Sequence, residues 1–343
     1  MNIAVLGAGG FGIALSVMAA KYGHSVTLWS AFEQEVALLQ TERENKKLLP
    51  GVVLPQEVSL TTDVHCVLGK ELVLLAVPSS VVHQVAERFK EIIPPQAVVV
   101  NVAKGLEEAS LKRLSQVLGE FLPNNRIVVL SGPSHAEEVA RGVPTTVVAA
   151  SSDRAAAEFV QDALMNATLR IYVNDDVVGV ELGGALKNII ALAAGIADGL
   201  GLGDNTKAAL MTRGITEMAR LGVLLGGKTE TFAGLSGIGD LIVTCTSMHS
   251  RNRRAGILIG QGLSAKEAIE QVGMTVEGYR SAKCAYLLAQ QVGIEMPIVN
   301  EVYRVLYEGK NAKEALSDLM GRSKKHESEE IWLYSTGGRE TVH

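Results

Sequence analysis

The chain has 343 residues, which leaves room for about two domains, each with a substantial core. Apolar residues make up 47% of the sequence and charged residues 20%, as in ordinary globular proteins. The formal net charge of −5 argues against the strongly basic surface that binds nucleic acid or an anionic membrane.

The first thirty residues have the order strand, glycine turn, helix, strand. An apolar run, 2–6, leads into Gly7-Ala8-Gly9-Gly10-Phe11-Gly12, and an alanine-rich helical stretch and a second apolar run, 25–29, follow. A G-x-G-x-x-G sequence alone is a weak signal, but within a βαβ unit its glycines have a mechanism. Gly7 permits the tight turn, Gly9 lets the backbone approach a pyrophosphate, and Gly12 lets the helix pack against the strand. We therefore expect a dinucleotide here; the alternative is a glycine-rich turn that binds nothing.

Strands and helices continue to alternate through the first half of the chain. We expect strands at 2–6, 25–29, 72–77, 97–101, 127–130, 145–149 and 169–173. We expect helices at about 11–22, 33–40, 81–92, 110–118 and 135–141. This alternation predicts an α/β domain, a Rossmann-type doubly wound parallel sheet with helices on both faces.

The pattern becomes helical after residue 176. We predict a dinucleotide-binding domain at 1–176, an all-helical substrate domain at 177–322 and a charged, flexible tail at 323–343. The most apolar stretch, 182–202, contains Lys187, Asn188 and Asp198, so a buried helix is favoured over a membrane span.

The location and metal content can also be predicted. No basic segment followed by an apolar core and a cleavage site begins the chain, so we expect a cytoplasmic protein. Three scattered cysteines and seven histidines show no metal-ligand spacing, so no metal is expected.

Polar residues follow several of the predicted strands, where an open α/β sheet binds its ligands. The clusters are Val77-Pro78-Ser79-Ser80, Asn101 to Gly105 and Ser131 to Ala136. Lys104 directly follows a buried strand, where a cation is costly unless it is paired. It either faces an anionic ligand or is a solvated loop lysine, and its position alone does not separate these.

The second half supplies a candidate reactive group. Lys187 lies in an apolar helix, so its amine either reaches solvent at the rim or is partly desolvated, which would lower its pKa toward the range useful for acid/base catalysis. A further cluster combines Asp240, Thr244 and Ser250-Arg251-Asn252, which together suit a phosphate and hydroxyl groups. Arg251, Arg253 and Arg254 could instead form one solvated face.

These pieces, in this order, resemble NAD(P)-dependent glycerol-3-phosphate dehydrogenase of the bacterial, single-chain type. The resemblance extends from Met1 to about Arg322. The motifs that carry it are the glycine turn, Ala103 to Glu107, Ser131 to Glu137, Glu181 to Asn188, Gly237 to Cys245, Ser250-Arg251-Asn252 and Thr275-Val276-Glu277-Gly278.

The resemblance implies reduction of dihydroxyacetone phosphate to sn-glycerol 3-phosphate, for phospholipid synthesis, with Lys187 as the proton donor and acceptor. It implies a homodimer and NAD or NADP as cofactor. The net charge and the interrupted apolar stretch, not the resemblance, predict no nucleic acid partner and no membrane insertion. The implied substrate-binding residues are Lys104, Gly132, Ser134, Lys187, Asp240, Thr244, Ser250, Arg251 and Asn252. The implied cofactor-binding residues are Gly7, Gly9, Gly10, Phe11, Gly12, Lys104, Ala136, Arg251, Thr275 and Glu277.

Two points stay open at this stage. Family members that use NADPH usually carry an arginine shortly after the second strand, where this chain has Ala31. The strand also does not end in an acidic residue that would bind a ribose hydroxyl. We therefore expect NADH to serve at least as well as NADPH. The alternative function is a related 3-hydroxyacid or 3-hydroxyacyl-CoA dehydrogenase, although no histidine is near Lys187 in the sequence.

Overall fold

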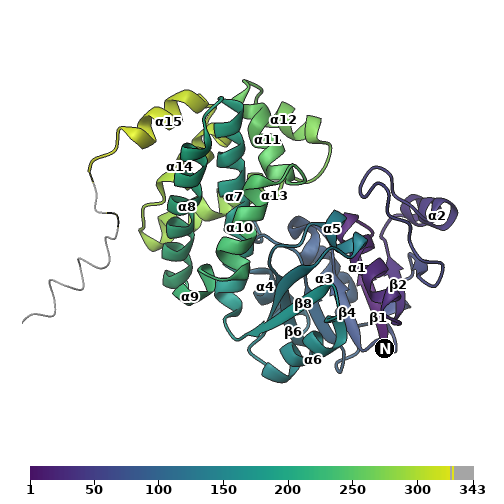
Figure 1. The fold of residues 1–343 in the computed structure, drawn as a ribbon. Helices are drawn as coiled ribbons and strands as arrows, with labels where there is room; N and C mark the ends of the chain where they lie inside the picture. The colour runs from purple at the N-terminus through teal and green to yellow at the C-terminus, as the bar shows by residue number, and fades with distance from the viewer. Residues whose placement is uncertain (325–326, 328–343) are drawn as a thin grey trace, which may run out of the picture.

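The computed structural model describes residues 1–324 and 327, and it consists of a sheet half followed by a helical half (Figure 1). The strands are β1 (Asn2–Leu6), β2 (Ser25–Trp29), β3 (Ser59–Thr61), β4 (Leu72–Leu75), β5 (Val98–Asn101), β6 (Arg126–Ser131), β7 (Thr145–Ala150) and β8 (Leu169–Asn174). Their order across the sheet is β3-β2-β1-β4-β5-β6-β7-β8. The predicted fold class is confirmed.

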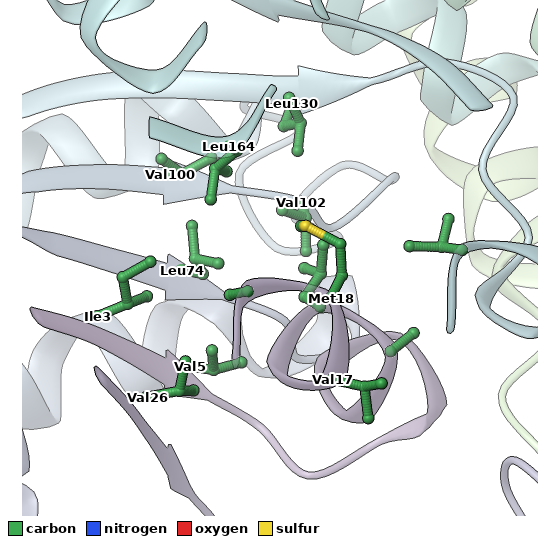
Figure 2. Close-up of a cluster of buried hydrophobic side chains, with 14 of the residues drawn as sticks. Ile3, Val5, Val17, Met18, Val26, Leu74, Val100, Val102, Leu130 and Leu164 are labelled. Carbon is green, nitrogen blue, oxygen red and sulfur yellow. The ribbon is translucent and has the colours of Figure 1, made fainter. Parts of the chain in front are cut away.

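Helices cover both faces of this sheet. They are α1 (Gly10–Lys21), α2 (Glu33–Glu42), α3 (Val82–Phe89), α4 (Leu114–Phe121), α5 (Ala136–Arg141) and α6 (Arg154–Leu164), with short 3₁₀ turns η1 (Val64–Val67) and η2 (Ser79–Val81). Ile3 and Val5 of β1 belong to the core on one face, shown in Figure 2, and Ala4 and Leu6 to the core on the other. Successive strand residues face opposite sides, so a sheet covered twice needs apolar residues at every position.

The sheet differs from the prediction in three places. β7 runs antiparallel to β6 and β8 runs parallel to β7, so the last two strands are reversed and the sheet is not wholly parallel. The connection through the short helix α5 reverses the chain, and the apolar pattern of β7 is the same for either direction. The edge strand β3 and the helix α6 were not predicted; β3 has only three residues, too few to show a pattern.

The helical half is built around one long helix, α7 (Val177–Gly199). The others are α8 (Asp204–Leu224), α9 (Thr229–Phe232), a π-helical turn η3 (Leu235–Gly239), α10 (Asp240–Thr246), α11 (Arg251–Gly260), α12 (Ala265–Val272), α13 (Glu277–Val292), α14 (Pro297–Tyr307) and α15 (Ala312–Met320). α7 packs against α8, α10, α11 and α13.

Among the described residues, α7 is the one helix that is long and apolar enough to cross a membrane, but 89% of that stretch is buried inside the protein. This agrees with the prediction of a buried helix. Most of the tail predicted at 323–343 lies outside the described residues.

Candidate active site

The glycine turn between β1 and α1 forms an open cradle. Gly7 has a φ of +116°, and a Cβ there would lie 2.6 Å from the Ala76 carbonyl oxygen. A Cβ on Gly12 would lie 1.9 Å from the Gly7 carbonyl oxygen, whereas one on Gly9 would meet nothing within 4 Å. The backbone is thus closely packed on the protein side and open above Gly9.

The start of α1 completes this cradle. The helix begins at Gly10, and no side chain caps its first N–H groups, which suits a pyrophosphate at a helix N-terminus. The Ala136 methyl lies 4.0 Å from the position of a Cβ on Gly10, so Ala136 borders the cradle, as the resemblance implies. Phe11 packs against the sheet core behind it. These residues fit a dinucleotide.

Lys104 is paired inside the junction between the two halves. Its Nζ donates to Asp240 Oδ2 at 2.7 Å, to the Gly132 carbonyl at 2.7 Å and to Ser134 Oγ at 3.3 Å. Lys104 follows β5, Gly132 and Ser134 follow β6, and Asp240 is the first residue of α10. The solvated-lysine alternative is wrong. An ammonium group has three N–H donors, and all three are used here.

Lys187, in the middle of α7, binds the other side of the same carboxylate. Its Nζ donates to Asp240 Oδ1 at 2.5 Å and to Thr244 Oγ1 at 2.7 Å. Thr244 Oγ1 in turn donates to the Asp240 carbonyl at 2.6 Å, which turns its lone pairs toward the amine. Lys187 is 5% exposed, so the rim position considered for it is wrong. Two of its three donors are used, and one is left for a ligand.

Burial and charge set the proton affinities of this cluster. Burial, helped by the nearby Lys104 ammonium, lowers the pKa of Lys187 to about 8, even though Asp240 opposes the change. Burial alone would raise the pKa of the Asp240 carboxyl, but Lys104 and Lys187 together hold it below its ordinary value. At neutral pH the cluster is one carboxylate between two ammonium groups, and it carries an excess positive charge.

The side-chain amides of Asn188 and Asn252 form a hydrogen-bonded network next to Lys187. Asn252 Nδ2 donates to Asn188 Oδ1 at 2.9 Å, and Asn252 Oδ1 accepts from the Gly278 N–H at 2.8 Å. Asn188 Nδ2 also lies 3.4 Å from the Lys104 carbonyl. Asn252, a predicted substrate residue, is therefore hydrogen-bonded to Asn188, which directly follows Lys187 in the sequence. These hydrogen bonds connect α7, α11 and α13.

The arginine segment divides into different environments. Ser250 caps α11, with its Oγ accepting from the Arg253 N–H at 3.2 Å. Arg253 donates to Asp198 Oδ2 at 2.8 Å and to the Thr246 carbonyl at 2.6 Å, so it is structural. Arg251 is exposed and makes no hydrogen bond or ion pair among the described residues, but its guanidinium is close enough to Glu277 and Glu137 to feel their charges. The single solvated face considered for the three arginines is thus wrong for Arg253.

Glu277 joins the helical half to the end of β4. Its carboxylate accepts from the Ser79 N–H at 3.0 Å and from Ser79 Oγ at 2.5 Å. Thr275, two residues earlier, is half-buried. Thr275 precedes α13 and Glu277 begins it.

Sequence reasoning missed three residues at this junction. Ser79 and Asn188 lie inside motifs that it did mark, but nothing in those motifs showed that they bind Glu277 and Asn252. His135 is the third: its ring lies 5.7 Å from that of His249, and its buried Nε2 has no hydrogen-bond partner in the described structure. Burial first, and then the Lys187 charge, lowers the pKa of His135. Its closeness to Lys187 arises only from folding.

A dinucleotide cradle in the sheet half, together with a buried lysine–aspartate–lysine cluster at the junction with the helical half, is the arrangement of a nicotinamide-dependent dehydrogenase. Residues 1–324 and 327 contain no group of His, Cys, Asp and Glu that could hold a metal ion. Residues 2–157 match the family model described as the NAD-dependent glycerol-3-phosphate dehydrogenase N-terminus, and residues 176–317 match that of its C-terminus. The chain belongs to the NAD-dependent glycerol-3-phosphate dehydrogenase family.

Individual relatives agree along the whole chain. It is 58% identical to the glycerol-3-phosphate dehydrogenase [NAD(P)+] of Moorella thermoacetica, covering 96% of this chain and 98% of that one. It is 56% identical to the enzyme of the same name from Thermoanaerobacter sp., covering 95% and 99%. The crystal structure of glycerol-3-phosphate dehydrogenase from Coxiella burnetii superposes with a TM-score of 0.91 at 40% identity, covering 94% of this chain and 99% of that one.

Proposed function

We propose that this protein reduces dihydroxyacetone phosphate to sn-glycerol 3-phosphate reversibly, with NADH or NADPH, and so supplies glycerophospholipid synthesis. The observation that carries the proposal is the Lys187–Asp240–Lys104 cluster at the junction that also holds the glycine cradle. The excess positive charge of that cluster favours an anionic substrate, and the family to which the chain belongs supports a phosphorylated triose.

Lys187 is the proposed acid/base group. When bound, the nicotinamide cofactor supplies or accepts the hydride at the substrate's C2. Asp240 and Thr244 hold two donors of the Lys187 ammonium, and the third points to the substrate's C2 oxygen in our proposal. During reduction Lys187 gives its proton to the developing alkoxide, and during oxidation the neutral amine takes it back.

Lys104 and the α11 residues position the substrate. Lys104 has no spare donor, so it acts by holding Asp240 and by its charge, and a substrate oxygen can replace its longest bond, that to Ser134. Arg251, which is exposed and makes no hydrogen bond or ion pair among the described residues, is suited to bind the phosphate. Gly132, Ser134, Ser250 and Asn252 complete the proposed substrate pocket. We assign Gly7, Gly9, Gly10, Phe11, Gly12, Lys104, Ala136, Arg251, Thr275 and Glu277 to the cofactor side.

The organisation of the chain is also part of the proposal. We place the domain division at 176/177, which the end of β8 at Asn174 and the start of α7 at Val177 support. We further propose that the protein is cytoplasmic and forms a homodimer. Light scattering of the purified protein tests the oligomeric state.

The main test removes the Lys187 amine. We expect Lys187→Met to lower kcat for dihydroxyacetone phosphate about 10²- to 10⁴-fold while calorimetry still detects NADH binding. Lys207→Met is the matched control, because Lys207 pairs with Asp198 at 2.7 Å outside the cluster. Wild-type turnover by Lys187→Met would overturn the assignment of Lys187, and turnover of 3-hydroxyacids in place of the triose phosphate would overturn the substrate.

A further inference from the structure

The end of β2 is where a Rossmann domain reads the ribose that carries the 2′-hydroxyl or 2′-phosphate. Here that end is fixed beside the glycine turn, because the Gly7 N–H donates to the Trp29 carbonyl at 2.9 Å. On its other side the Ser30 N–H donates to the Thr61 carbonyl at 3.1 Å, and Trp29 Nε1 donates to the Thr62 carbonyl at 3.0 Å. The position is rigid, yet the strand itself ends without an acidic or basic side chain.

A carboxylate reaches this position from the next helix instead. Ser30 is 2% exposed, and its Oγ donates to Glu35 Oε2 at 2.5 Å, across the turn that enters α2. The same Oγ accepts from the Phe32 N–H at 3.2 Å, so the hydroxyl is oriented toward Glu35. Glu35 therefore stands in the first turn of α2 with one oxygen anchored at the strand end and the other able to accept a hydrogen bond.

The neighbouring arginine is not arranged to neutralise this carboxylate. Arg43, directly after α2, directs its guanidinium to the carbonyls of Leu54, Pro55 and Val58, where it closes the loop before β3. Lys46, in the loop after α2, lies 3.8 Å from Glu42 at the end of that helix. Lys46 and Lys47 are exposed in the segment whose Leu48 carbonyl approaches Gly10, which makes them the rival cations for a 2′-phosphate.

We infer that Ser30 and Glu35 together determine the cofactor preference of this enzyme, with Glu35 accepting a hydrogen bond from the ribose 2′-hydroxyl of NADH and repelling the 2′-phosphate of NADPH. The inference rests on the proposed function, and it specifies which residues read the cofactor. It explains how a strand that is followed by serine, and not by an acidic residue, can still select for the hydroxyl. At a few ångströms near a protein surface, the repulsion between a carboxylate and a 2′-phosphate is large enough to favour NADH clearly over NADPH.

The test measures cofactor binding without turnover. NADH and NADPH are titrated separately into the protein by calorimetry in the absence of the triose phosphate. We expect the wild type to bind NADH more tightly, and Glu35→Gln to bring the two dissociation constants at least ~5-fold closer, mainly by tightening NADPH. Ser30→Ala, which frees the carboxylate from its anchor, should weaken NADH binding.

Glu33→Gln is the matched control, because it removes the same charge from the same helical turn at an exposed side chain away from Ser30. It should leave the ratio of the two dissociation constants within ~2-fold of the wild-type ratio, since an exposed charge is screened by solvent. Equal effects of Glu33→Gln and Glu35→Gln would overturn the inference, as would a wild type that binds NADPH as tightly as NADH through Lys46 and Lys47. Both of those results leave the proposed reaction intact, whereas failure to bind either cofactor would overturn the proposed function as well.

Discussion

Lys187 shows how one residue can be set for acid/base chemistry by its surroundings. Burial disfavours its charged form and Lys104 adds repulsion, while Asp240 favours the protonated amine, and the resulting pKa of about 8 lies close to neutral pH. A carboxylate shared with a second lysine is essential to this balance. If the carboxylate bound Lys187 alone, it would keep the amine charged. If Lys187 had no carboxylate partner, its buried ammonium would be uncompensated.

The first prediction is the pH dependence of the two reaction directions. Reduction needs the ammonium form of Lys187, so kcat for dihydroxyacetone phosphate should fall as pH rises through about 8. Oxidation of glycerol 3-phosphate needs the neutral amine, so its kcat should rise through the same range. Rate profiles in both directions measure this, and two limbs that move in the same direction would contradict the proposed role.

The second prediction removes the charge of Asp240 but keeps its shape. Asp240→Asn deletes the carboxylate that raises the pKa of Lys187, so that pKa should fall and the basic limb of the reduction profile should move to lower pH. A structural role alone would lower kcat without moving the limb. Lys207→Met, which does not touch the cluster, should leave the limb in place.

The sequence allowed individual reactive residues to be predicted better than their partners. A lysine in an apolar helix and an aspartate in a polar cluster can be recognised in the sequence, and the structure brings Lys187 and Asp240 together. That Lys104 uses all its donors, or that Arg253 serves Asp198, depends on distances between segments that are far apart in the chain. Residue spacing contains no information on those distances.

At the scale of elements, the spacing of α7 and α11 is set by glycines. A Cβ on Gly195 would lie 2.1 Å from the Arg253 carbonyl oxygen, and one on Gly256 would lie 2.2 Å from that of Leu192. Gly199 and Gly260 face carbonyl oxygens of the opposite helix in the same way. The helices thus approach backbone to backbone, and this brings Asn252 within hydrogen-bond distance of Asn188.

The third prediction tests this close approach. Gly256→Ala should force the helices apart and cost about 1–3 kcal/mol of stability, as overpacking does, and it should raise KM for the triose phosphate because Asn252 moves with α11. Urea unfolding and steady-state kinetics measure the two effects. Gly119→Ala, in the exposed interior of α4 with nothing within 4 Å of the new Cβ, should be neutral or stabilising by up to about 1 kcal/mol.

Elements with a long or strongly apolar pattern were predictable, and short or direction-dependent features were not. β1 and β2 fall at the predicted residues because their apolar runs are bounded by turns. The direction of β7 depends on where α5 places the chain, and hydrophobic periodicity is blind to strand direction. β3 forms because β2 offers it an edge at Thr27 to Trp29, a tertiary cause.

For the whole molecule, the function depends on holding the sheet half and the helical half together, since each contributes part of the cluster. Lys104 binds Asp240 across the junction, and Ser79 binds Glu277. A third link has a buried carboxylate: Arg113, before α4, donates to Glu181 of α7 at 2.6 Å, and the Ser115 N–H donates to the same carboxylate at 2.8 Å. Burial raises the pKa of Glu181 even with Arg113 beside it.

The last prediction breaks this third link. Arg113→Met leaves the Glu181 carboxylate buried without its cation and should cost about 3–5 kcal/mol at neutral pH. A carboxyl whose pKa is raised by folding binds protons more tightly in the folded state, so its contribution to stability is present at low pH and is lost as pH rises through the folded pKa. Without Arg113 that pKa rises further, so the deficit of the variant should be larger at about pH 8 than at about pH 5.

Urea unfolding of wild type and variant at both pH values measures this deficit. Arg154→Met is the matched control, because Arg154 pairs with Glu158 at 2.7 Å on the exposed surface of α6, where such a pair contributes little. An equal loss of stability in the two variants, or a deficit for Arg113→Met that does not grow with pH, would contradict the role of the Arg113–Glu181 link. If the stability deficit of Arg113→Met grows with pH and its kcat is also lower, the Arg113–Glu181 link and the catalytic cluster depend on the same packing of α7 against the sheet half.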